Sequence, residues 1–130
     1  MDCSGQFTIT GWDENTLSEK LGGIKHAHAS VTQNYEGAMV GQSNVEFIMS
    51  YQSSTSAVFV GFESFVGVLK GKRGTISFKH DGNFNEGIAS STFTSVEGSA
   101  TGELSGCSIA GTFASGESGK AQYNITVEQV

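Results

Sequence analysis

The feature that most constrains this chain is an alternation of apolar and polar residues with period two, in runs separated by turn residues. Such alternation is typical of β-strands that bury one face, and no segment shows the longer period of an amphipathic helix. The 18 glycines and the absence of proline suit tight turns and curved strands. The pattern predicts eight strands, at about residues 5–12, 24–37, 40–52, 57–70, 73–84, 87–97, 107–115 and 120–129.

Short links between consecutive strands predict an all-β fold, a closed eight-stranded antiparallel barrel in meander order. Closure also removes exposed strand edges, which promote aggregation. Residues 13–23 are predicted to form a polar connection, and residues 98–106 a loop with a short helical turn near 100–104. At this length we expect a single domain over residues 1–130.

Charge and cysteine content narrow the classes of function. The net charge is −6, and the seven Lys and Arg residues are scattered, so we expect no nucleic-acid partner. No run is apolar enough to span a bilayer, and Met1–Gly11 lacks the pattern of a signal peptide, so no membrane partner is expected. Cys3 and Cys107 lie far apart without metal-like spacing, which predicts a reduced, cytoplasmic protein.

Strand 73–84 indicates which side of the sheet faces the lumen, because Ile76, Phe78 and His80 share its apolar side. A two-residue loop at Gly71–Lys72 would then pair Glu63 with His80 across the hairpin. This places one carboxylate and one imidazole inside the barrel.

A loop at residues 53–56 would in turn pair Glu46 with Glu63. Ionising both of two facing carboxylates in an apolar barrel costs too much free energy, so the two would share a proton. His80 adds a second site that can hold a proton. Glu46, Glu63 and His80 are therefore candidate acid–base catalysts. The alternative is a buried polar network that fixes strand register without turnover, and a slip of one residue would separate the row.

An apolar wall is expected beside this row, and it predicts a lumen ligand. Trp12 ends the first strand and is a candidate cap for the barrel mouth. A three-residue loop at 37–39 would bring Ser30 beside Glu46 and His28 diagonal to it, whereas a two-residue loop would place Val31 there. The candidate ligand-binding residues are Trp12, His28, Phe59, Phe65 and Phe78, and Ile48, Leu69 and Ile76 are expected on the same face.

The spacing His26-x-His28 is that of a metal pair on a strand, but Glu36 lies too far along the chain for a cupin-like site. We therefore expect neither a metal nor another cofactor. No nucleophile elbow, P-loop or dinucleotide fingerprint is present in the sequence.

The other faces of two strands are also apolar, which predicts a homo-oligomer, most simply a dimer. The outward residues are expected to be Val45, Phe47, Met49 and Tyr51 on the third strand, and Val58, Val60, Phe62, Val66 and Val68 on the fourth.

The sequence resembles an uncharacterised bacterial domain-of-unknown-function family over nearly its whole length. The resemblance is carried by residues 59–69, 71–80 and 98–106, by Gly5-x-Phe7, by Trp12 and by the strand that contains Glu46. That family is similar to the allene oxide cyclase barrel, which implies eight antiparallel strands around a central cavity. Relatives of that barrel include cyclases and proteins without an assigned activity, so the resemblance implies a fold more than a function.

Three hypotheses follow. The first is a barrel that binds a small apolar or amphipathic molecule in its lumen. The second is a cofactor-free cyclase or isomerase that uses Glu46, Glu63 and His80. The third is an oligomeric barrel whose lumen is packed shut, and the space left inside the barrel separates it from the first two.

Overall fold

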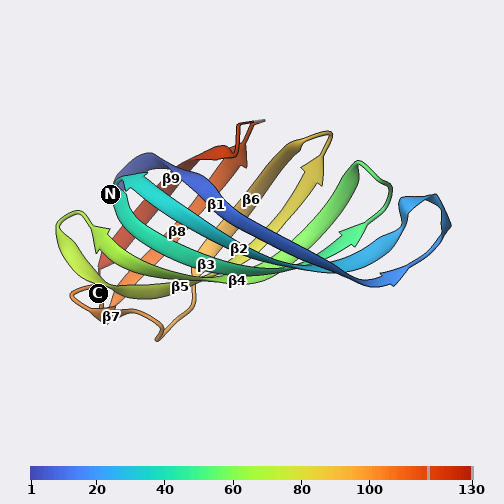
Figure 1. Ribbon diagram of the computed structural model, residues 1–130. Helices are drawn as coiled ribbons and strands as arrows, with labels where there is room; N and C mark the ends of the chain where they lie inside the picture. Colours follow the sequence, from blue (N-terminus) through green and yellow to red (C-terminus); the bar gives the residue numbers. More distant parts are fainter. Residues whose placement is uncertain (117, 130) are drawn as a thin grey trace.

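The computed structural model of the chain describes residues 1–116 and 118–129, and most of them lie in β-strands (Figure 1). The predicted eight-stranded antiparallel barrel is confirmed, with a ninth, two-residue strand added to it. The elements are β1 Asp2–Glu19, a 3-10 helix Leu21–Gly23, β2 Lys25–Gly37, β3 Met39–Tyr51, β4 Ser56–Leu69, β5 Lys72–Asn85, β6 Ile88–Ser95, β7 Thr101–Gly102, β8 Cys107–Ser115 and β9 Lys120–Gln129. No helix in the described part of the chain has the length and apolarity needed to cross a membrane.

The strands follow one another around the barrel in meander order, and the pairing of β4 with β5 closes the sheet. All neighbours are antiparallel, as expected for strands joined by short loops. The short strand β7 pairs with Gly74 and Thr75 of β5, beyond the point where the pairing of β5 with β6 ends. The chain then turns through hydrogen bonds from Leu104 N to Thr101 O and from Ser105 N to Gly102 O.

The largest departure from the sequence analysis is the length of β1. This strand continues through most of the predicted connection and still pairs with β2 at Glu19 and Lys25. In Figure 1 the resulting β1–β2 hairpin reaches beyond the other strands. A projecting hairpin has solvent on both faces, so its residues carry no apolar alternation, and two register irregularities further interrupt the period.

Aromatic rings fill the lumen. Tyr35 contacts the rings of Phe7, Phe65 and Tyr123, with centroids 5.2 to 5.4 Å apart. Inward-facing glycines make room for other rings: a Cβ added to Gly82 would lie 2.6 Å from Phe59 Cζ. The centre of the barrel is therefore a packed core.

Candidate functional site

The β4–β5 turn determines what faces Glu63 in the lumen. The loop consists of Lys70 and Gly71, both with positive φ, as a type I′ hairpin turn requires. The predicted loop lay one residue later, so the predicted pairing of Glu63 with His80 is wrong by two residues. Glu63 instead faces Phe78, and His80 faces Gly61. A shift of two keeps every side chain on its face, so Glu63 and His80 both still point inward.

Glu63 and His80 are in contact diagonally across the two strands. His80 Nε2 lies 2.6 Å from Glu63 Oε1, and both side chains are almost completely buried. On its other side, His80 Nδ1 lies 3.0 Å from Ser91 Oγ on β6. Ser91 Oγ donates to the carbonyl oxygen of Thr92 at 3.1 Å, so it accepts the hydrogen of Nδ1. His80 Nε2 and Glu63 Oε1 share one short hydrogen bond that links β5 to β4.

Two donors from β2 hold the second carboxylate oxygen of Glu63. Tyr35 donates its hydroxyl to Oε2 at 2.5 Å, and Gln33 Nε2 donates to the same atom at 3.2 Å. Gln33 also donates to Ser43 Oγ on β3. Burial, followed by the charge of Glu63, raises the pKa of Tyr35 well above its usual value. The network therefore joins β2, β3, β4, β5 and β6 through side chains alone.

Rings enclose this network. The imidazole of His80 contacts the rings of Phe47, Phe93 and Phe113, with centroids 5.1 to 5.7 Å apart. Among the described residues, every buried side-chain nitrogen and oxygen has a hydrogen-bond partner. A fully satisfied network of this kind fixes the register of its strands.

The predicted position of Glu46 beside Glu63 is wrong. Tyr51 pairs with Ala57, one residue away from the predicted register, so Glu46 faces Phe62 on the outer surface. Its side chain is 58% exposed. A register shift of one residue moves every side chain of a strand to the opposite face. Val45, Phe47 and Met49, predicted to face outward, consequently line the core, whereas the predicted wall residue Ile48 is exposed.

The register between β2 and β3 agrees with the three-residue loop that the sequence analysis favoured. Ser30 pairs with Glu46, and Ser30 Oγ donates to Glu46 Oε1 at 2.9 Å. His28 Nε2 lies 3.1 Å from the same oxygen. These contacts lie on the outside of the barrel, so His28 and Glu46 do not meet Glu63.

The remaining predicted site residues divide between the core and the surface. Phe59, Phe65 and Phe78 are buried in the lumen, as the sequence analysis expects. Trp12 pairs with the inward-facing Val31, is 48% exposed and donates from its Nε1 to Glu14 Oε1 at 3.1 Å, and its role as a cap for the barrel mouth stays a prediction. Neither His26 nor His28 belongs to a cluster of three or more metal-ligating side chains within the described residues.

Sequence reasoning missed Gln33, Ser43 and Ser91, and it gave Tyr35 no role. Gln33 and Tyr35 share the parity of Val31, which is a usable signal that they point inward. Nothing in the sequence indicates which buried polar groups meet, because that depends on register between strands.

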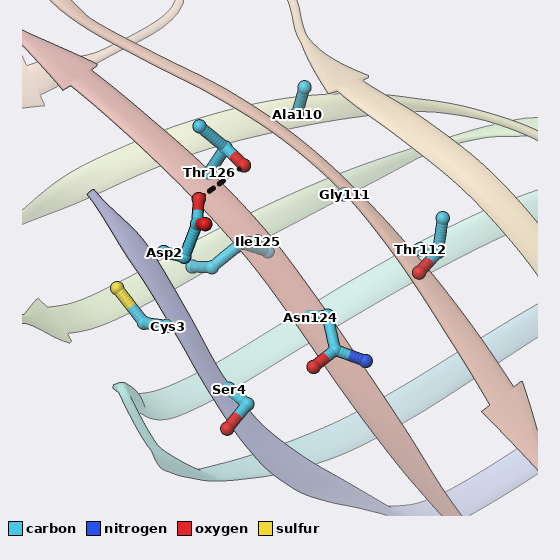
Figure 2. Close-up of a pocket in the computed structure, with 9 residues that line it drawn as sticks. All are labelled: Asp2, Cys3, Ser4, Ala110, Gly111, Thr112, Asn124, Ile125 and Thr126. Atoms are coloured by element: carbon cyan, nitrogen blue, oxygen red, sulfur yellow. Dashed lines mark hydrogen bonds between the residues drawn. The ribbon is translucent and has the colours of Figure 1, made fainter.

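The outer surface has two contrasting sides. We call one the apolar face: Val40 and Ile48 of β3 with Val58, Val60, Phe62 and Val66 of β4, each 47 to 59% exposed. Towards the β1–β2 hairpin it contains a hollow of about 340 Å³, lined mainly by Leu17, Ile48, Val58 and Val60. We call the other the polar face: the outward residues of β6, β8, β9 and the start of β1, part of which Figure 2 shows.

Comparisons with known proteins agree with this architecture. A family model described as "Protein of unknown function (DUF3224)" matches residues 3–127. The fold is similar to a crystal structure from Shewanella oneidensis MR-1, described as a protein with unknown function from the same family. The two share 22% sequence identity and superpose with a TM-score of 0.82, over 100% of this chain and 98% of that one. No curated protein matches the sequence.

Proposed function

Because this chain belongs to the DUF3224 family of proteins of unknown function, we propose a function from its own geometry: it is a self-associating barrel that binds a second copy of itself through the apolar face. The observation that carries this proposal is the six large apolar side chains exposed on β3 and β4. Exposed apolar side chains gathered on two neighbouring strands in this way are rare on a soluble monomer and are typical of an interaction site.

Charge around the apolar face favours a second copy as the partner. Phe62 lies at its centre, with Glu46 paired to it on β3 and Lys79 paired to it on β5. If two copies pack face to face about a twofold axis along β4, Phe62 meets Phe62. The same rotation places Glu46 of each copy over Lys79 of the other. The face is thus self-complementary in shape and charge, as an isologous dimer requires.

The size of the patch sets the expected strength. The apolar face together with the flanking outer side of β5, which contributes Lys79, spans three strands about 4.8 Å apart, and over ten residues of about 3.4 Å each it covers roughly 500 Å² per partner. An interface of about 1,000 Å² in total is at the lower end of specific complexes, so we expect a reversible dimer with a micromolar Kd.

A structural role for the buried network fits this proposal better than catalysis or a lumen ligand. A ligand inside the barrel would have to displace Phe59, Phe65 or Phe78, which pack in the core. A substrate would have to reach Glu63 and His80 through the rings that surround them. We therefore place small-molecule binding outside the lumen, and we retain a cytoplasmic location as part of the proposal.

The first test is the mass of the protein in solution as a function of concentration. Sedimentation velocity across the micromolar range should show a monomer–dimer equilibrium. Phe62→Lys should give a monomer at every concentration, because it buries a charge against its own copy. Thr94→Lys, on the outer surface of β6, is the matched control and should leave the dimer intact. A monomer for the unaltered protein throughout the range would refute the proposal.

A charge exchange tests the predicted axis. Glu46→Lys and Lys79→Glu should each weaken the dimer roughly tenfold, because each places like charges opposite one another. The double variant restores opposite charges and should recover the original Kd. If the double variant is weaker than either single one, the axis along β4 is wrong.

A further inference from the structure

The polar face lies on the opposite side of the barrel from the apolar face, because β9 is four strands away from β4 in either direction around the sheet. We propose that it binds an uncharged oligosaccharide across β1, β9, β8 and β6. This inference goes beyond self-association and does not depend on it, since a dimer through β4 leaves the polar face open.

A row of four polar side chains carries the proposal. Ser4 pairs with Asn124, Asn124 with Thr112, and Thr112 with Thr92, so these residues lie side by side on four neighbouring strands. All four are exposed. Adjacent strands are about 4.8 Å apart, so the row presents hydroxyl and amide groups at regular intervals over roughly 14 Å. A chain of sugar rings offers hydroxyl groups over a comparable length.

The surface has two shallow depressions along this row. One hollow of about 470 Å³ lies over β1, β9 and β8, and another of about 380 Å³ extends from there over β6 and β5. Thr112 and Asn124 line both hollows, so the two adjoin. On the outer side of β8, Thr112 lies between Ala110 and Ala114. These alanine side chains are short, so β8 forms the bottom of the depression. Figure 2 shows Thr112, Asn124 and Ser4 around the first hollow.

Three of the four side chains are available to a ligand. Within the described residues, the side chains of Ser4, Thr112 and Asn124 make no hydrogen bond to protein, whereas Thr92 Oγ1 donates to the carbonyl oxygen of Asp81 at 3.3 Å. Their neighbours are occupied: Thr126 donates to Asp2 Oδ1 at 2.9 Å, and Gln122 donates to Gln6 Oε1 at 3.1 Å. A hydroxyl and an amide each donate and accept, which matches the hydroxyl groups of a saccharide.

Charge and topology select the ligand class. The described residues that line the two hollows include Asp2 and Asp81 but no Lys or Arg, which disfavours an anionic ligand. A peptide would bind best by adding a strand to a sheet edge, but these strands are paired on both sides within the closed barrel. An uncharged polyhydroxylated chain fits the remaining chemistry. On a shallow, hydrated face its Kd should be millimolar.

The test is a titration of 15N-labelled protein with maltotriose and cellotriose, followed by two-dimensional NMR. At least one trisaccharide should shift the side-chain amide signals of Asn124 and the backbone signals of Thr92 and Thr112, with saturation. Asn124→Ala should weaken binding at least tenfold. Asn44→Ala, an exposed asparagine of β3, should leave it unchanged. The same titration on Phe62→Lys separates this proposal from the proposed dimer.

Three results would overturn the inference. One is the absence of saturable shifts with both trisaccharides into the tens of millimolar. Another is an unchanged affinity in Asn124→Ala. The third is tighter binding of trigalacturonate, an anionic trisaccharide of similar size, than of either neutral one.

Discussion

The apolar and polar faces are built from the same alternation, yet they differ in chemistry. One row of paired residues runs from Ile48 and Val60 on one side of the barrel, through Asp81 and Thr92, to Thr112 and Asn124 on the other. Inward positions on both sides are apolar, apart from the network around Glu63. The lumen therefore determines the fold, and the outward positions are free to specialise. The binding functions of the protein should therefore be sought among the residues that point outward from the barrel.

The largest expected effect tests whether both faces depend on one core. Glu63→Ala removes the carboxylate that His80, Tyr35 and Gln33 contact. It should lower the free energy of unfolding by about 3–5 kcal/mol, because it leaves buried polar groups without partners. Urea unfolding measures the loss, and both faces should lose their binding in the same transition.

Glu63→Gln is the matched control for this prediction. It keeps an acceptor for the β2 donors and should cost clearly less than Glu63→Ala. A loss below about 1 kcal/mol for Glu63→Ala would contradict a structural role for the network.

The next effect should be confined to the apolar face. Phe62→Ala removes the ring at the proposed twofold axis and should weaken the dimer by about 2 kcal/mol, or roughly 30-fold in Kd. Thr112→Ala should not change the dimer. Sedimentation equilibrium compares the two variants. Equal effects would mean that the two faces do not act separately.

A third prediction concerns the lumen alone and has a defined pH dependence. The raised pKa of Tyr35 means that its hydroxyl stays protonated in the folded state after it ionises in the unfolded chain. Its contribution is therefore complete below the pKa of an unfolded tyrosine, about 10, and is lost as pH rises towards the folded pKa. Tyr35→Phe should cost about 1–2 kcal/mol at neutral pH. It should also flatten the decline of stability above about pH 10, measured by thermal unfolding. An unchanged alkaline slope would contradict it.

The smallest effect makes the polar face resemble the apolar one. Thr112→Val preserves the shape of the side chain and removes its hydroxyl. We expect the stability to change by less than about 0.5 kcal/mol, since the residue is exposed and lies on a strand. The NMR titration should show that the variant binds the trisaccharide with a severalfold higher Kd. Unaltered affinity would indicate that the row of hydroxyls is not the binding element.

The sequence predicts the strands well because their inward periodicity is strong in most of them. It also places Glu63 and His80 correctly inside the barrel, since an error of two residues at the β4–β5 turn preserves the face. The position of Glu46 fails because the β3–β4 loop differs by one residue from the predicted length. Loop length is a local property that decides a long-range contact, and Ser, Thr and Gln residues around 52–56 do not specify it. The sequence does not predict the projecting part of β1 for a different reason. A strand that is polar on both faces shows no alternation between buried and exposed residues.

The contact between Gly82 and the ring of Phe59 has a consequence for how such a barrel can vary. A methyl group at Gly82 would clash with the carbonyl oxygen of Ser90 and would lie 2.6 Å from the ring of Phe59. Phe59→Leu would remove the second of these clashes but not the first, so Gly82→Ala stays disfavoured whichever side chain stands at position 59. Variation in this part of the interior is therefore open to position 59 and closed to position 82.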